Sequence, residues 1–142
     1  MKVREVMTTP VVKIRPEESI SVAARTLAHY NIGVLPVCGN GGLVCGLLTD
    51  RDIVTRCLAA NRQPEMTTVQ EIMTGKVLSV PPDMDLGAAA HLMGRQQIRR
   101  LPVVEQGRLC GMLSLGDIAS TENGSYDAAD ALTEITSNVS NR

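Results

Sequence analysis

Two short stretches of the sequence place a hydroxyl residue and an aspartate three positions apart at the end of an apolar run. The first is GLLTDRDIV (46–54), with Thr49 and Asp52, and the second is GMLSLGDIA (111–119), with Ser114 and Asp117. Each run is typical of a strand that turns directly into a helix, whose free N–H groups attract an oxyanion. The hydroxyl can donate to that oxyanion, and the aspartate can accept two hydrogen bonds from the vicinal diol of a ribose. The pattern therefore predicts a clamp for a ribose and a phosphate.

Each turn also has a purely structural interpretation. Thr49 and Ser114 can serve as helix N-caps, and the helix dipole favours an aspartate in the first turn. Taken once, the turn is better explained in this way, because such caps are common. Its recurrence at matched positions of two diverged copies favours a binding role, because duplication does not require this turn to stay more alike than its surroundings.

The region around the two turns is duplicated as a whole. Residues 3–38 align with 69–104, and residues 42–53 align with 107–118. VREVMT corresponds to VQEIMT, and IGVLPV corresponds to IRRLPV. Thr68 and Glu71 have the spacing of a capping box at the start of the second copy. We expect a first repeat at 1–60, a linker at 61–68, a second repeat at 69–120 and a tail at 121–142.

Both copies have the same predicted order of elements. A brief strand (11–14 or 77–80) precedes a helix with Ser19 or Asp85 as its N-cap. A hairpin follows, pairing 35–38 with 43–48 or 101–104 with 109–113, and a second helix begins at the aspartate. One copy of about fifty residues could hardly cover its own apolar sheet face. We therefore predict an α/β (α+β) fold, with two β-α-β-β-α repeats packed sheet to sheet about a pseudo-twofold axis.

The tail has a pattern of its own. After the ENGS stretch, apolar and small residues recur at helical spacing, which predicts a short terminal helix capped by Ser125. The residues that fall on one face of this helix are Ala128, Ala129, Leu132, Ile135 and Thr136, and the helix is expected either to cover exposed sheet or to help form an oligomer.

Composition excludes several classes of function. The 142 residues include 14 basic and 15 acidic side chains, a net charge of −1, which gives no field that would attract nucleic acid or an anionic membrane. No apolar stretch approaches the ~20 residues needed to cross a bilayer, and MKVREVMTTP lacks the apolar core of a signal peptide. We expect a soluble, cytoplasmic protein.

The four cysteines are scattered and form no C-x-x-C motif. Isolated cysteines in a reducing compartment are usually small buried apolar residues, so we expect reduced thiols and no bound metal. A zinc site that uses some of them with His29 or His91 is the less favoured alternative. The cysteines are Cys38, Cys45, Cys57 and Cys110.

The repeated pattern MT…V…hPxxxhxxAxxxhxxxxIxxLPVh…G…GhhTxxDI resembles the cystathionine β-synthase (CBS) domain, and two in tandem resemble a Bateman module. The resemblance covers about residues 1–120 and is nearest to small bacterial stand-alone CBS-pair proteins, which carry no catalytic domain. Members of that family bind adenosine-containing ligands in two clefts between the repeats. The resemblance thus implies AMP, ADP or ATP as the ligand, with NAD or S-adenosylmethionine as alternatives.

The resemblance also implies which residues line each cleft. Asp52 and Asp117 would hold the ribose, with Thr49, Arg51 and Ser114 near the phosphates. The Asp52 cleft would be lined by Lys76, Val77, Leu78 and the IRRLPV stretch with its phosphate-binding Arg99 and Arg100. The Asp117 cleft would be lined by Pro10, Val11, Val12 and the IGVLPV stretch, where Gly33 and Val34 replace the arginines.

The two clefts are therefore not expected to be equivalent. The second turn has Ser114 in place of threonine, and LG in place of DR, which could weaken its cleft. On this assignment, loss of Asp52 should matter more for phosphorylated ligands.

A non-catalytic sensor of adenine nucleotides is the favoured function, ahead of an enzyme and two further alternatives. Against an enzyme, the sequence has no Ser-His-Asp or Cys-His arrangement, metal signature or P-loop. Asp50 and Asp52 could form an acid pair, but Leu115 replaces Asp50 in the second copy. A scaffold with empty clefts and a metal-binding CBS pair are the alternatives. Because CBS pairs usually assemble through their helices, and the 88–93 helical surface is rich in Ala and Met, we expect a homodimer that acts on a separate regulated protein.

Overall fold

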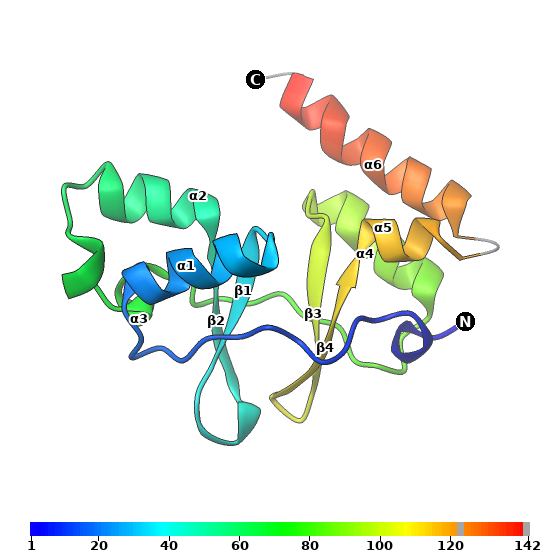
Figure 1. Cartoon of the computed structure of the whole chain (residues 1–142). Coiled ribbons are helices and arrows are strands. Elements are labelled where there is room, and N and C mark those ends of the chain that lie inside the picture. The colour runs from blue at the N-terminus through cyan, green and yellow to red at the C-terminus, as the bar shows by residue number, and fades with distance from the viewer. Residues whose placement is uncertain (122–123, 141–142) are drawn as a thin grey trace. The chain divides into compact units, whose positions relative to one another are not determined.

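The computed structural model describes residues 1–121 and 124–140, without the side chains of 125 and 138–140. The chain forms two compact units (Figure 1). The first-repeat unit is Val12–Val77, and the second-repeat unit joins Met1–Val11 to the chain from Leu78 onward. Each unit contains one two-stranded antiparallel sheet with helices, which confirms the predicted mixed α and β class.

The two units have matching elements. Those of the first-repeat unit are α1 (Ile20–Tyr30), β1 (Val34–Cys38), η2 (Asn40–Gly42), β2 (Val44–Thr49), α2 (Asp50–Asp52), the π-helical turn η3 (Ile53–Leu58), η4 (Pro64–Met66) and α3 (Val69–Ile72). Those of the second-repeat unit are η1 (Val3–Glu5), α4 (Leu86–Gln96), β3 (Arg100–Glu105), β4 (Arg108–Ser114), α5 (Leu115–Ala119) and α6 (Ser125–Ser140). Among the described residues, no helix is both long and apolar enough to span a bilayer.

The predicted N-caps of α1 and α4 are confirmed. Ser19 Oγ accepts a hydrogen bond from Val22 N, and Asp85 Oδ2 accepts one from Ala88 N, each at 3.2 Å. Both helices end at a residue in the left-handed conformation, which terminates the helical hydrogen-bond pattern. These residues are Asn31 and Gln97, with φ of 53° and 58°.

The predicted capping box before α3 is also confirmed. Thr68 N donates to Glu71 Oε2 at 2.6 Å, and the Arg62 guanidinium donates to Glu71 Oε1 at 2.7 Å. The hydrogen bond from the Thr68 backbone, followed by those from the Thr68 hydroxyl and Arg62, lowers the pKa of Glu71 below its ordinary value. The charged form of Glu71 is therefore the one that stabilises this turn.

Both predicted hairpins form, but the strands predicted at 11–14 and 77–80 shrink to single bridges. Ile14 pairs in parallel with Val37, and Val80 pairs with Val103. The next hydrogen bond of each ladder would need the backbone N–H of Pro36 or of Pro102, which proline lacks. The prolines of the LPV motif thus limit each strand to one pair.

The two VxExMT stretches, residues 3–8 and 69–74, are called the Met-Thr segments here. Within each sheet, one of them lies along β2 or β4, on the edge away from the single bridge to β1 or β3. Thr74 exchanges two backbone hydrogen bonds with Leu47 of β2, and Thr8 exchanges two with Met112 of β4, at 2.8–3.1 Å. Each Met-Thr segment therefore pairs with the hairpin of the other sequence repeat. The spatial units do not coincide with the sequence repeats.

A glycine in each hairpin leaves room for this crossed pairing. A Cβ added at Gly46 would lie 2.9 Å from the Thr74 carbonyl oxygen, and one added at Gly111 would lie 3.1 Å from that of Thr8. Both distances are shorter than ordinary van der Waals contact, so a side chain at either position would displace the segment.

The crossed pairing continues in the two hydrophobic cores. Val3 is fully buried in a cluster whose other members come from 80–135, and Val69 is fully buried in a cluster of residues 14–72. The core of the second-repeat unit thus needs a residue from the start of the chain.

Helix α6 buries two of the five residues on the predicted face, together with one residue beside that face. Its buried side chains are Ala128, Ala131 and Ile135, whereas Ala129, Leu132 and Thr136 are exposed. Ala131 packs against Gly94 of α4, where an added Cβ would lie 3.0 Å from the Ala131 Cα. Because Gly94 has no side chain, the Ala131 face of α6 can approach α4 closely. The predicted cap, Ser125, lies outside the described side chains.

Candidate ligand-binding site

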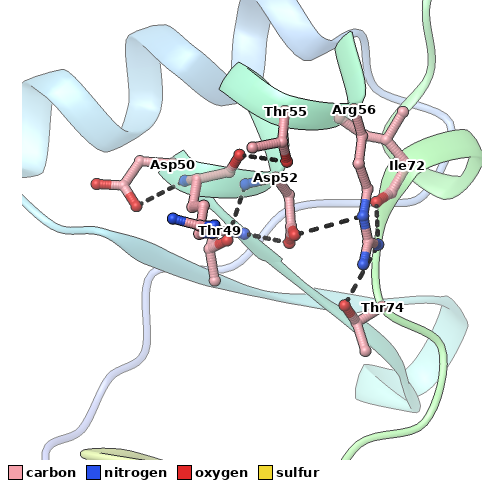
Figure 2. A network of polar contacts seen from close by, with 8 residues as sticks. Thr49, Asp50, Asp52, Thr55, Arg56, Ile72 and Thr74 are labelled. Carbon is pink, nitrogen blue, oxygen red and sulfur yellow. Dashed lines mark hydrogen bonds and ion pairs between the residues drawn. The ribbon is translucent and has the colours of Figure 1, made fainter. Parts of the chain in front are cut away.

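The first turn is held by a reciprocal pair of hydrogen bonds between Thr49 and Asp52. Asp52 N donates to Thr49 Oγ1, and Thr49 N donates to Asp52 Oδ2, both at 3.0 Å (Figure 2). Thr49 ends β2 with extended backbone and Asp52 lies in the first helical turn, so the three-residue spacing forms a capping box. The Asp52 side chain is only 13 % exposed.

The second turn has the same geometry. Asp117 N donates to Ser114 Oγ, and Ser114 N donates to Asp117 Oδ2, again at 3.0 Å. The replacement of threonine by serine therefore leaves the turn unchanged. Both turns carry the structural cap that the sequence allowed, which by itself neither requires nor excludes a ligand.

The carboxylates differ in what else they contact. Asp52 Oδ1 lies 3.8 Å from Arg56 Nε. The Arg56 guanidinium also donates hydrogen bonds to the Ile72 carbonyl oxygen at 3.0 Å and to Thr74 Oγ1 at 3.5 Å (Figure 2). Asp117 Oδ2 accepts a further hydrogen bond, at 3.5 Å, from Thr8 Oγ1.

The residue at the position of Arg56 in the second repeat is Thr121, which donates to the Ile118 carbonyl instead. Across the described residues, no ion pair or hydrogen bond occupies Asp117 Oδ1. Asp117 is thus the carboxylate with a free oxygen, and Asp52 is the one with a cation beside it.

Sequence reasoning missed three residues around these aspartates. Thr8 and Thr74 had a signal, since both belong to the repeated Met-Thr segments, and the structure brings each to the turn of its unit. Arg56 had no such signal in the sequence, because the second repeat has the uncharged Thr121 at the matching position.

Arg99 and Arg100 lie beside the turn of their own repeat. Arg100 pairs with Ser114 across the β3–β4 hairpin, and the Arg99 carbonyl accepts a hydrogen bond from Leu115 N at 2.9 Å. In the first repeat, Val34 pairs with Thr49, and the Gly33 carbonyl accepts from Asp50 N at 3.0 Å. The I-x-x-L-P-V stretch therefore meets the turn of its own repeat in both units.

A groove of about 510 Å³ opens beside the two arginines. Its volume lies in the range of small-molecule sites. It is lined by Arg99, Arg100, Ser114, Leu115, Gly116, Ala119, Ala128, Ala129 and Leu132. The arginines thus share this groove with Ser114, within the second-repeat unit.

The remaining predicted residues divide between the units. Lys76 and Val77 belong to the unit that contains Asp52, and Pro10 and Val11 to the unit that contains Asp117. Leu78 and Val12 fall on the opposite sides of these boundaries. Arg51 is exposed, and its backbone N–H donates to the Asp50 carboxylate at 2.8 Å.

All four cysteines are free thiols. Burial raises the pKa of the Cys38 and Cys45 thiols, which disfavours the thiolate that a metal would need. Within the described part of the chain, no three His, Cys, Asp or Glu side chains form a group that could hold a metal ion.

The repeated turns, the hairpins and the Met-Thr segments all lie in residues that one family model matches. A model of the CBS domain matches the chain twice, at residues 3–59 and 69–123. The chain belongs to the CBS domain family.

Curated relatives match over most of their own length. The CBS domain-containing protein YhcV of Bacillus subtilis is 41% identical over 133 residues, 94% of each chain. Hypoxic response protein 1 of Mycobacterium tuberculosis is 34% identical, covering 82% of this chain and 81% of its own.

Solved structures of CBS proteins show the same fold. Hypoxic Response Protein I with two coordinated zinc ions has a TM-score of 0.77 at 33% identity and covers 84% of this chain and 97% of its own. The CBS domain pair of protein MJ0100, in complex with 5′-methylthioadenosine and S-adenosyl-L-methionine, has a TM-score of 0.74 at 30% identity. The match covers 84% of this chain and 93% of that one. CBS-pair relatives thus include one with adenosine ligands and one with zinc.

Proposed function

We propose that this protein is a non-catalytic regulatory module that binds an adenosine-containing nucleotide at its CBS turns. The observation that carries the proposal is the second turn, where Ser114 lines a groove with two arginines. The carboxylate of Asp117, which caps the same turn but is not part of that lining, keeps one oxygen without a partner among the described residues. The adenosine ligands of the MJ0100 CBS pair support the choice of ligand class. The zinc of the other relative has less support here, because the described residues offer no ligand set for a metal.

The geometry favours the Ser114–Asp117 turn as the principal site. Asp117 Oδ1 is available for a ribose hydroxyl, and the Ser114 hydroxyl, which accepts from Asp117 N, retains its own hydrogen to donate. Arg99 and Arg100 lie on the same groove as Ser114, so phosphates there would meet two permanent positive charges. We therefore propose AMP, ADP or ATP as the ligand, bound with Asp117 rather than Asp52 as the main ribose residue.

A thermal-shift panel tests this proposal directly. AMP, ADP, ATP, NAD and S-adenosylmethionine are added separately to the purified protein, and the best ligand is then titrated by calorimetry. At a hundred times its Kd, a ligand of the native state adds about 2.7 kcal/mol, which raises the Tm by roughly 10 °C for a domain of this size. A protein that unfolds cooperatively at the same Tm with every compound at millimolar concentration would contradict the proposal and favour a scaffold with empty clefts.

We also propose that the protein is a cytoplasmic homodimer that presents its ligand state to a separate partner protein. Apolar side chains remain exposed along helix η3 of the first-repeat unit, where Val54 is 56 % and Leu58 53 % exposed. Such a surface favours burial against a second copy. Light scattering at micromolar concentration should give twice the 15.2 kDa chain mass. A monomer mass would contradict the dimer.

A further inference from the structure

Helix α6 lies beyond the second CBS repeat and packs against α4 and α5 (Figure 1). Ala128, Ala131 and Ile135 anchor it in the core. The next residues around the helix, Ala129 and the 40 % exposed Leu132, line the arginine groove opposite the strand ends. The groove therefore has three walls, formed by the start of β3, the turn into α5 and the side of α6.

The charges around α6 are segregated. Its acidic residues Asp127, Asp130 and Glu134 line a separate small hollow with His91 of α4. The arginine groove has no acidic residue in its lining, and within the described residues neither Arg99 nor Arg100 forms an ion pair. Two exposed cations with no carboxylate partner among the described residues share this lining with small apolar side chains, a combination suited to a multiply charged anion.

We propose that α6 is the third wall of a phosphate groove, so that this C-terminal helix limits how the phosphates of the ligand fit and is held in place when they bind. The proposal rests on the proposed function for the adenosine part of the ligand. The groove for the phosphates is inferred separately, from its two arginines and from the residues of α5 and α6 that line it. The position of α6 would then depend on whether a polyphosphate occupies the groove, which gives the protein a way to signal ligand state outside its CBS repeats.

The test places a carboxylate on the α6 wall. Leu132→Glu puts a negative charge into the groove, and Tyr126→Glu puts the same charge on the same helix at a position that is 83 % exposed and does not line it. Both variants and the wild type are titrated with ATP and with adenosine by calorimetry. Inorganic tripolyphosphate is tested on all three by thermal shift. Amide hydrogen exchange of 126–137 is followed in the wild type with and without ATP.

We expect Leu132→Glu to weaken ATP binding about tenfold through like-charge repulsion and to leave adenosine binding within about twofold of wild type. Tyr126→Glu should bind both as the wild type does. Tripolyphosphate should raise the Tm of the wild type and of Tyr126→Glu but not of Leu132→Glu, and ATP should slow exchange in α6.

The outcomes separate this proposal from the proposed function. If tripolyphosphate stabilises the wild type but not Leu132→Glu while no adenosine compound binds, the groove proposal stands and the nucleotide function fails. Equal losses for ATP and adenosine, equal tripolyphosphate shifts in wild type and Leu132→Glu, unchanged α6 exchange although ATP binds, or no binding of either anion by the wild type would each overturn the groove proposal.

Discussion

Replacement of Asp117 by alanine is expected to weaken binding of the best adenosine nucleotide by about ten- to a hundredfold, or ~1.5–3 kcal/mol. The reason is the loss of charge-assisted hydrogen bonds from the ribose hydroxyls to a carboxylate whose Oδ1 has no other partner among the described residues. The same substitution removes a capping-box contact, which should lower the free energy of unfolding by only ~0.3–1 kcal/mol. Calorimetric titration and thermal unfolding of the variant measure the two effects separately.

Asp52→Ala is the matched control, because it removes the same cap from the other turn. Its carboxylate lies beside Arg56, and the first-repeat unit has Gly33 and Val34 where the second has two arginines. We therefore expect a smaller loss of affinity than for Asp117→Ala, which reverses the order that the sequence alone favoured. If the nucleotide binds both variants as tightly as the wild type, the two aspartates are helix caps and nothing more.

Val3→Asp should destabilise the second-repeat unit by about 3–5 kcal/mol, although the substitution lies nearly a hundred residues before that unit's hairpin in the chain. Val3 is fully buried among side chains from 80–135, and a carboxylate there would have no partner in an apolar cluster. Val69→Asp is the equivalent change in the other core and should destabilise the first-repeat unit instead. Chemical denaturation gives the size of each loss, and amide hydrogen exchange shows which hairpin is affected.

Met66→Asp is the surface control for these two variants. Met66 is 78 % exposed and lies three residues before Val69, so its change in stability should stay within about 0.5 kcal/mol. Faster exchange in the β1–β2 hairpin of Val3→Asp, with the β3–β4 hairpin unchanged, would contradict the crossed packing of the Met-Thr segments.

The features that depend on local chemistry were predictable from the sequence. Ser19, Asp85 and the Thr68–Glu71 pair were recognisable as caps because a cap is a relation between residues three positions apart. The hairpins followed from apolar runs on either side of a glycine-rich turn.

The features that depend on long-range choice were not predictable. The two Met-Thr segments are so alike that no periodicity tells which hairpin each one joins. In the structure, Val3 lies in the core of the second-repeat unit and Val69 in that of the first-repeat unit. The buried face of α6 was predicted only in part for a similar reason, since Ala128 and Ala129 are equivalent in pattern. The groove beside Arg99 is lined by the start of β3, the turn into α5 and α6. The family resemblance places Arg99 beside the Asp52 turn instead, and that placement stays a prediction.

The crossed pairing of the Met-Thr segments also has a consequence for synthesis on the ribosome. Val12–Val77 is one continuous stretch, so this unit can close once Thr74 has emerged. Val3 and Met7 are made before this stretch, whereas β4, with which Thr8 pairs, is made about a hundred residues after them. At ~5–20 residues per second, the apolar N-terminal segment waits on the order of 5–20 s for its partner. During this interval a nascent chain would expose Val3 and Met7 beside an already folded neighbour, and a chaperone or a second nascent chain could bind them.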